Sequence, residues 1–214
     1  MACVTAAATR CSLVAATERC LDRPAPTAAT DPLLVDSVGS AHVTDYVIRS
    51  ASAVSASPPE LAALYRAAYG PLAEIGFPSS AAETDATDVR SWLADRECWV
   101  VVDAADAPAA DARSAAPAGV PVGAVQLRER PGWPCPEVCR LAVRPAHQRE
   151  GLGARLLDHA EGVVADRGHD RVRLRSFTDH PFLLEWYADR GYERVGLQEL
   201  DSRPFDAPVL ERRL

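Results

Sequence analysis

The chain has 214 residues, a length that predicts one domain with a tail rather than several domains. Its 23 basic and 30 acidic residues give a net charge of −7, which argues against a nucleic-acid partner and mildly favours a cationic substrate such as an amine. No stretch approaches the roughly 20 apolar residues of a membrane span, so no membrane partner is expected.

The cysteines indicate neither a metal site nor a disulfide framework. The chain has six of them, and none forms a Cys-x-x-Cys pair: Cys3, Cys11, Cys20, Cys98, Cys135 and Cys139. A zinc site needs four ligands at suitable spacing, so no metal is expected. Reduced thiols and the lack of a recognisable signal peptide predict a cytoplasmic location.

Residues 1–42 differ in composition from the rest of the chain. They are rich in Ala, Thr and Pro and show no sustained hydrophobic period, which predicts a disordered or loosely structured tail. Residues 43–214 are then expected to form a single domain. Because Met1 is the only methionine, an overlong start assignment is a hypothesis, and whether residues 1–42 belong to the native protein stays open.

The first half of the domain alternates between strand and helix patterns. The residues Ser57-Pro58-Pro59-Glu60 predict a capping box that opens a helix, because Ser precedes the first turn and Glu follows three positions later. Around it we expect a strand over Thr44–Arg49, a helix over Asp88–Asp95, a strand over Cys98–Val102, a loop over 104–118 and a return strand over Val120–Leu127.

The second half continues with strands and helices of comparable length. A helix after Pro145 is predicted by apolar residues at helical spacing, and Gly168 stands where a glycine ends a helix. We further expect strands over Glu137–Val143, Arg171–Ser176, Tyr192–Leu200 and Val209–Arg213, and a helix from Pro181 to Gly191. The order predicts an α/β fold of the α+β kind, with helices packed on a mixed sheet.

The turn between the Glu137–Val143 strand and the next helix has the properties of an anion site. A helix start leaves backbone N–H groups unpaired, and the helix dipole adds partial positive charge there. Gly151 and Gly153 lack side chains that would keep a phosphate away. A dinucleotide fingerprint fails because Leu156 replaces its third glycine, and a P-loop fails because no Lys is present. A glycine-rich helix start without a ligand remains the alternative.

Two motifs, taken together, narrow these alternatives. The segment Gln148-Arg149-Glu150-Gly151-Leu152-Gly153-Ala154 resembles the Gln/Arg-x-x-Gly-x-Gly/Ala signature of the GCN5-related N-acetyltransferase (GNAT) family. Further along, Tyr187-Ala188-Asp189-Arg190-Gly191-Tyr192 resembles that family's Tyr-x-x-x-Gly-Phe/Tyr element. The resemblance implies a central, mostly antiparallel sheet with splayed strands, flanked by helices, that binds acetyl-CoA.

The resemblance also assigns cofactor-binding residues. The pantetheine arm would bond to the backbone of the strand before the turn, like an added strand. The pyrophosphate would lie on the turn and the first helical turn. The expected set is Leu141, Ala142, Val143, Gln148, Arg149, Glu150, Gly151, Leu152, Gly153 and Ala154.

Two catalytic residues are expected from the family pattern. Tyr187 matches a tyrosine near the thioester sulfur, where its hydroxyl would protonate the departing thiolate or bond to it. Glu137 is the first candidate for the general base, with Glu129 and Glu185 as weaker ones. By alternation, Glu137 is expected to share a face with Cys139, Leu141 and Val143.

The chain departs from the family where Asp179-His180 replaces a frequent Asn. Asp179 is expected to cap the last helix, and His180 is interpreted as a surface histidine.

The leading hypothesis is an N-acetyltransferase that moves an acetyl group from acetyl-CoA to a primary amine by direct attack in a ternary complex. A non-catalytic CoA-binding or regulatory module and a structural protein on the same fold are the alternatives. The acceptor is left open between a small molecule and a peptide, and a homodimer is also left open.

Overall fold

The computed structural model describes residues 45–104, 119–200 and 203–214. The expected tail over 1–42 and nearly all of the expected loop over 104–118 therefore lie outside the described residues. The part from residue 45 onward forms one compact unit built on a single sheet.

Seven strands form this sheet in the order β1-β2-β3-β4-β5-β7-β6. All neighbouring pairs are antiparallel except β4 and β5, which are parallel. The sheet is thus mixed and mostly antiparallel, as the sequence predicted. The strands are β1 (Tyr46–Ser50), β2 (Glu97–Asp103), β3 (Gly123–Arg128), β4 (Glu137–Val143), β5 (Arg171–Arg175), β6 (Glu193–Gln198) and β7 (Ala207–Arg213).

Within the described residues, four α-helices accompany the sheet, together with short 3₁₀ turns. The helices are α1 (Pro58–Tyr69), α2 (Ala86–Asp95), α3 (Leu152–Asp166) and α4 (Leu183–Asp189). The 3₁₀ turns are η1 (Gly70–Ile75), η2 (Ser80–Ala82) and η3 (Pro145–His147), which the sequence did not indicate. The capping box of α1 is confirmed, because Ser57 and Glu60 each accept the other's backbone N–H.

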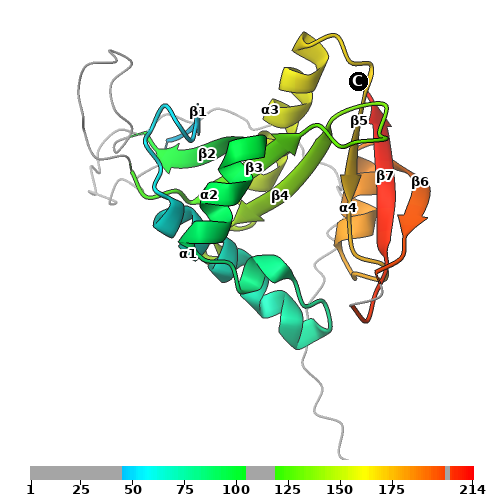
Figure 1. The fold of residues 1–214 in the computed structure, drawn as a ribbon, viewed down its shortest axis with the longest axis horizontal. Coiled ribbons are helices and arrows are strands. Elements are labelled where there is room, and N and C mark those ends of the chain that lie inside the picture. Colours follow the sequence, from blue (N-terminus) through cyan, green and yellow to red (C-terminus); the bar gives the residue numbers. More distant parts are fainter. Residues whose placement is uncertain (1–44, 105–118, 201–202) are drawn as a thin grey trace, which may run out of the picture. The chain divides into compact units, whose positions relative to one another are not determined.

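The helices cover both faces of the sheet. α1 and α2 pack against one face through Leu61, Leu64 and Val89, which meet Val100 of β2. α3 and α4 lie on the other face, where Leu156 and Tyr187 belong to a second apolar cluster. Figure 1 shows α1 and α2 in front of the sheet and α3 and α4 behind it. This is the layered arrangement that amphipathic helices adopt on a sheet.

Strands β4 and β5 separate along their length. Only two residue pairs connect them, Glu137 with Arg173 and Val138 with Leu174. Beyond these pairs the two strands diverge, which Figure 1 shows as a widening gap between their arrows. The splayed strands expected from the family resemblance are therefore present. Backbone groups of β4 beyond Val138 are left without a β5 partner, and this is where a ligand can add hydrogen bonds.

A β-bulge at Arg140 overturns the expected alternation along β4. The register with β3 shifts between Ala124 and Gln126, and Arg140 has a φ of 53°. Leu141 and Val143 therefore pack with Val138 on the α3 face, whereas Glu137 lies on the opposite side of the sheet from Val138. Glu137 does not share a face with Leu141 and Val143, because the extra residue reverses the alternation.

Candidate active site

The turn that follows β4 exposes the N-terminus of α3. Arg149 and Gly151 both adopt left-handed backbone conformations, with φ values of 67° and 77°. Gly151 is the N-cap of α3 and contributes no side-chain bond, and the first turn holds no acidic residue. The first helical bond runs from the Arg155 N–H to the Gly151 carbonyl at 3.0 Å. The preceding N–H groups of the first turn are thus positioned for an anion.

Two side chains connect this region to the diverging part of β4. The Gln148 amide donates to the Val143 carbonyl at 3.1 Å, which fixes the start of the turn to the end of the strand. The Tyr69 hydroxyl, at the end of α1, donates to the Leu141 carbonyl at 2.8 Å. Residues from α1, β4 and the turn therefore meet along the edge of β4 that β5 does not pair.

Tyr187 of α4 is buried on the α3 face of the sheet. Its side chain packs between the rings of Trp186 and Tyr192, at 4.8 and 5.5 Å between centroids. Burial raises the pKa of the Tyr187 hydroxyl far above its usual value, and the nearby Tyr69 raises it further. Tyr187 is therefore protonated at neutral pH and is equipped to donate a proton or a hydrogen bond, not to act as a base.

Tyr69 is a site residue that the sequence did not indicate. Burial raises its pKa to about 12, against a smaller opposing effect of Arg140. Tyr69 also contributes to the raised pKa of Tyr187. The helical spacing of Tyr65 and Tyr69 was visible in the sequence, but a helical pattern does not reveal which strand the last residue of the helix will meet.

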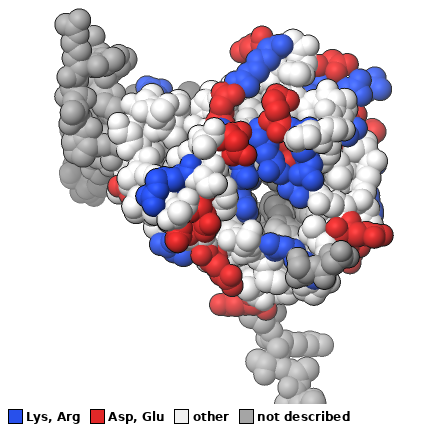
Figure 2. Space-filling view, viewed as in Figure 1, with Lys and Arg blue, Asp and Glu red and all other residues white. Residues whose placement is uncertain are grey.

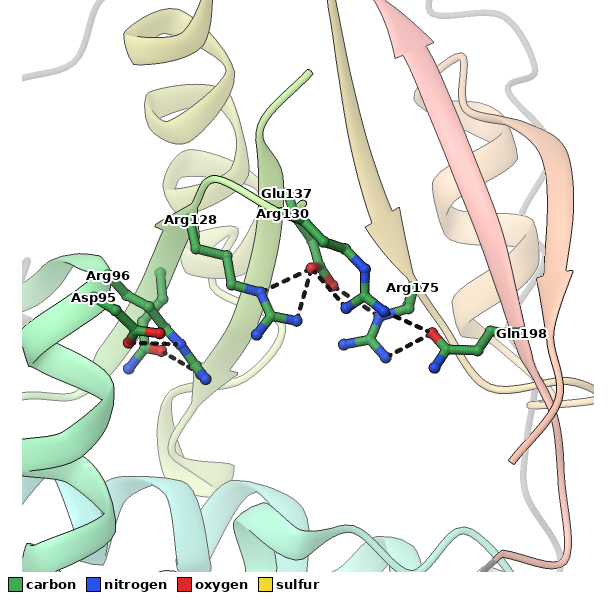
Figure 3. A network of polar contacts seen from close by, with 8 residues as sticks. Asp95, Arg96, Arg128, Arg130, Glu137, Arg175 and Gln198 are labelled. Atoms are coloured by element: carbon green, nitrogen blue, oxygen red, sulfur yellow. Dashed lines mark hydrogen bonds and ion pairs between the residues drawn. The ribbon is translucent and has the colours of Figure 1, made fainter. Parts of the chain in front are cut away.

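Glu137 is the centre of an ion-pair network. Its side chain is 1% exposed and contacts Arg128, Arg130 and Arg175 at 2.8, 3.5 and 2.8 Å. Figure 3 shows these three arginines converging on the carboxylate, from β3, from the segment after it and from β5. The Arg175 and Arg130 side chains also bond the Gln198 amide oxygen, at 3.0 and 3.3 Å.

This environment sets the chemistry of the Glu137 carboxylate. Burial by itself would raise its pKa, but Arg175 and Arg128 outweigh that effect and hold the pKa below the usual value. A carboxylate with a lowered pKa and occupied oxygens is a weak proton acceptor. The role of Glu137 as general base stays a prediction, and its contacts favour holding the arginines in place.

The remaining candidates of the sequence lie apart from this network. Glu129 and Glu185 are exposed. Asp179 does not cap α4, which begins at Leu183 rather than at Pro181. Instead the His180 Nδ1 accepts the N–H groups of Phe182 and Leu183, at 3.2 and 3.1 Å. His180 is half-buried, and its position one residue nearer the helix makes it the better acceptor.

With this geometry in place, the chain can be compared with known proteins. The model of the Acetyltransferase (GNAT) family matches residues 67–192, which is more than half of the chain. The chain therefore belongs to the GNAT family of acetyltransferases, and its enzymatic activity is acetyl transfer. Compared with curated proteins, the sequence has no match.

Solved structures share the fold at low sequence identity. A GCN5-related N-acetyltransferase from Rhodopseudomonas palustris is 18% identical with a TM-score of 0.58, covering 82% of this chain and 100% of that one. The ribosomal-protein-S18-alanine N-acetyltransferase from Escherichia coli is 16% identical with a TM-score of 0.56, over 79% and 94%. The NatC complex bound to Gag peptide and CoA is 16% identical with a TM-score of 0.53, over 79% and 99%. These likenesses establish the fold.

The described residues show neither a metal cluster nor a helix suited to a membrane. Among the described residues, no group of three or more His, Cys, Asp or Glu side chains is arranged to hold a metal ion. Within the same residues, none of the helices combines the length and the apolar character needed to cross a bilayer.

Proposed function

We propose that the chain transfers the acetyl group of acetyl-CoA directly to a primary amine, with both substrates bound at once. The observation that carries this proposal is the early separation of β4 from β5, because it leaves the β4 backbone from Leu141 to Val143 without a β5 partner, where the pantetheine arm would add its hydrogen bonds. The uncapped N-terminus of α3, which begins after Gly151, then meets the pyrophosphate.

The proposed cofactor-binding set is the one that the family motif assigns. Leu141, Ala142 and Val143 would bond the pantetheine arm, and the turn from Gln148 to Ala154 would bind the pyrophosphate. Support comes from the left-handed Arg149 and Gly151, which turn successive N–H groups toward one side. Gly153 also has room beside Val143, since an added Cβ would lie 3.9 Å from its side chain.

The proposed reaction is a single displacement on the thioester. The lone pair of the neutral amine attacks the carbonyl carbon, the new C–N bond forms and the C–S bond breaks. The thiolate receives a proton from the Tyr187 hydroxyl, and the proton lost by the amine nitrogen restores that hydroxyl, directly or through water. The products are an acetamide and CoA with a free thiol, so atoms and charges balance.

Tyr187 is proposed as the proton donor because its hydroxyl is protonated at neutral pH and the family pattern places this tyrosine near the thioester sulfur. Tyr69 is proposed to position β4 through its bond to the Leu141 carbonyl. If Glu137 were the base, kcat/KM would decrease at acidic pH as the Glu137 carboxylate became protonated. That decrease would occur below the usual carboxyl range, since the pKa of Glu137 is lowered. A decrease in kcat/KM as pH falls through the pKa of the acceptor amine would instead indicate that the amine binds in its neutral form.

The decisive experiment is an acetyl-CoA-dependent panel of amines, followed by release of the CoA thiol. Turnover of any amine together with acetylated product supports the proposal. Tight acetyl-CoA binding without turnover on the panel would favour the non-catalytic module. A melting temperature that acetyl-CoA does not raise would count against both and favour a structural protein.

Location and assembly are also proposals. Free Cys98, Cys135 and Cys139 support a reducing compartment, so a cytoplasmic location is proposed. Cell fractionation tests it. A homodimer stays a prediction that sedimentation of the purified protein will decide.

A further inference from the structure

We infer that the acceptor amine carries a carboxylate or phosphonate group, which binds to the arginines gathered around Glu137. This inference rests on the proposed acetyl transfer to an amine. The arginines in question are Arg128, Arg130 and Arg175, called here the arginine cluster. They come from the end of β3, the segment after it and the end of β5, and Figure 3 shows them side by side across the β4–β5 junction.

The cluster carries more positive charge than its acid balances. Glu137 supplies one negative charge to three guanidinium groups. The side chains of Arg128, Arg130 and Arg175 are only 19%, 26% and 26% exposed, so water solvates the two excess charges incompletely. Partly buried charge without a counter-ion is unfavourable, and a bound anion removes that cost. Planar guanidinium groups also match the two oxygens of a carboxylate or phosphonate.

Neutral partners hold the guanidinium groups in place without cancelling their charge. The amide oxygen of Gln198 accepts from both Arg130 and Arg175. The Arg130 guanidinium also lies over the ring of Trp133, 5.1 Å from its centroid. The amide of Gln198 and the ring of Trp133 orient the guanidinium N–H groups without neutralising them. The excess positive charge therefore remains available to bind an anion.

The position of the cluster matches the acceptor side of the proposed reaction. Glu137 lies at the closed end of the β4–β5 gap, on the face covered by α1 and α2. Four residues further along β4, the hydroxyl of Tyr69 from α1 on this face bonds the Leu141 carbonyl at 2.8 Å. An amine nitrogen in the gap would thus have its acidic group within reach of the cluster.

The phosphates of CoA do not explain the cluster. β4 runs from Glu137 to Val143, and six residue steps of a strand span about 20 Å. The turn proposed for the pyrophosphate follows the far end of the strand. The anion that the cluster would bind therefore belongs to the other substrate.

Further arginines make this side of the sheet basic. Arg140 lies 4.2 Å from the ring centroid of Trp92 and bonds the Ser80 hydroxyl at 3.4 Å, and both partners are uncharged. Figure 2 shows basic side chains beside a hollow on this face. The net charge of −7 favoured a cationic substrate, but the local charge has the opposite sign. Polyamines and aminoglycosides would be repelled here.

Aromatic contacts favour a small acceptor over an extended peptide. The ring of Phe77, in the α1–α2 connection, lies 5.7 Å from Phe177 and 5.7 Å from Phe205. Arg203 also bonds the carbonyl of Pro78. These contacts join the α1–α2 connection to the segments after β5 and before β7, and a long peptide along this path would have to displace them. The acceptor is therefore a small molecule.

The test compares acceptors that differ only in charge, with acetyl-CoA as donor. The panel holds α-amino acids, their methyl esters and amides, an aminophosphonate, a polyamine and an acidic tripeptide. We expect kcat/KM for the acidic small molecules to exceed that for their esters by at least about tenfold. Arg130→Gln should raise KM for the acidic acceptor and leave KM for acetyl-CoA unchanged, and Arg130→Lys should be intermediate. Arg194→Gln, an exposed arginine of β6, is the matched control.

The outcomes separate this inference from the proposed function. Equal kcat/KM for acids and esters, or a preference for the polyamine, overturns the inference while acetyl transfer stands. A preference for the tripeptide overturns the small-molecule class.

If nothing turns over, the proposed function fails, and a binding measurement then decides the inference. Tryptophan fluorescence can report binding at the cluster, since Trp133 lies under Arg130. N-acetyl amino acids that bind the CoA-loaded protein, and bind Arg130→Gln more weakly, support it. No binding at millimolar concentration overturns it.

Discussion

The hydroxyl of Tyr69 donates to the backbone carbonyl of Leu141 at 2.8 Å, across 72 positions of sequence. This bond connects the last residue of α1 to the part of β4 that β5 leaves unpaired. Tyr69 packs with the cluster under α1 and Tyr187 with the cluster under α3, so the two tyrosines of the proposed site come from different faces of the sheet.

Tyr69→Phe is expected to lower kcat/KM by about tenfold, because loss of one hydrogen bond worth about 0.5–1.5 kcal/mol frees this stretch of β4. Steady-state kinetics with varied acetyl-CoA measures the effect. The control is Tyr65→Phe on the same helix, whose hydroxyl accepts from Gln126. That variant should lose thermal stability rather than affinity for acetyl-CoA. If both variants behave alike, Tyr69 has no special connection to the site.

Tyr187→Phe should lower kcat by about 100-fold, in the range typical of a lost general acid, with little change in KM for acetyl-CoA. The raised pKa of Tyr187 also predicts that its hydroxyl adds no alkaline limb to the pH profile of the native enzyme below about pH 10. Tyr192→Phe is the control, since its hydroxyl bonds Glu161 at 2.8 Å and should matter for stability. An unimpaired Tyr187→Phe enzyme would remove Tyr187 from the mechanism.

Glu137→Gln should change how stability depends on pH. Because the arginines lower the pKa of Glu137, its ionised form stabilises the fold above about pH 4.3, its unfolded value, and the contribution is lost as pH falls through the lower folded pKa. We expect the variant to be about 1–3 kcal/mol less stable at pH 7, below the figure for a fully buried pair because the arginines are partly solvated.

Denaturant unfolding at a series of pH values between 3 and 7 measures that difference. It should shrink as pH falls below about 4.3, the unfolded value, and be smallest once pH has passed the lower folded pKa. Exposed Glu185→Gln serves as the control and should show a small difference throughout. A difference that stays constant down to pH 3 would mean that the ion pairs do not stabilise the fold.

The sequence predicted local features well because their causes are local. The capping box at Ser57 and Glu60 was confirmed, and so were the glycines that end helices: Gly168 and Gly191 both have positive φ values just after α3 and α4. The strand expected over Arg171–Ser176 was found as β5, with Val172 and Leu174 on its core face. Each of these patterns lies within a few residues, where backbone geometry alone decides the outcome.

Features that depend on strand pairing were not predictable in the same way. The bulge at Arg140 exists because β3 and β4 differ by one residue between two paired positions, and no local pattern marks it. The contact of Glu137 with Arg175 joins residues 38 positions apart. Arg175 lies within the strand that the sequence predicted over Arg171–Ser176, but only the β4–β5 pairing shows which acid it meets. The sequence therefore identified Glu137 as the candidate base, but it did not reveal the arginines that surround its carboxylate.

The turn after β4 offers the last prediction, since its two glycines differ in what they tolerate. Gly151 has a φ of 77°, a conformation that costs a side-chain-bearing residue roughly 1–2 kcal/mol. Gly153 is helical, and an added Cβ would meet Val143 at an ordinary 3.9 Å. Gly151→Ala should thus raise KM for acetyl-CoA several-fold by distorting the N–H groups that bind pyrophosphate, whereas Gly153→Ala should change KM little.

Gly162→Ala, in the middle of α3 with open space around it, completes the comparison as the control. It should raise the stability of the protein by roughly 0.5–1 kcal/mol through helix propensity and leave KM unchanged. KM for acetyl-CoA, together with the shift in melting temperature that CoA produces, distinguishes the three variants. Should Gly151→Ala bind CoA as tightly as the native protein, the pyrophosphate would have to lie elsewhere, because a strained turn cannot present the same row of donors.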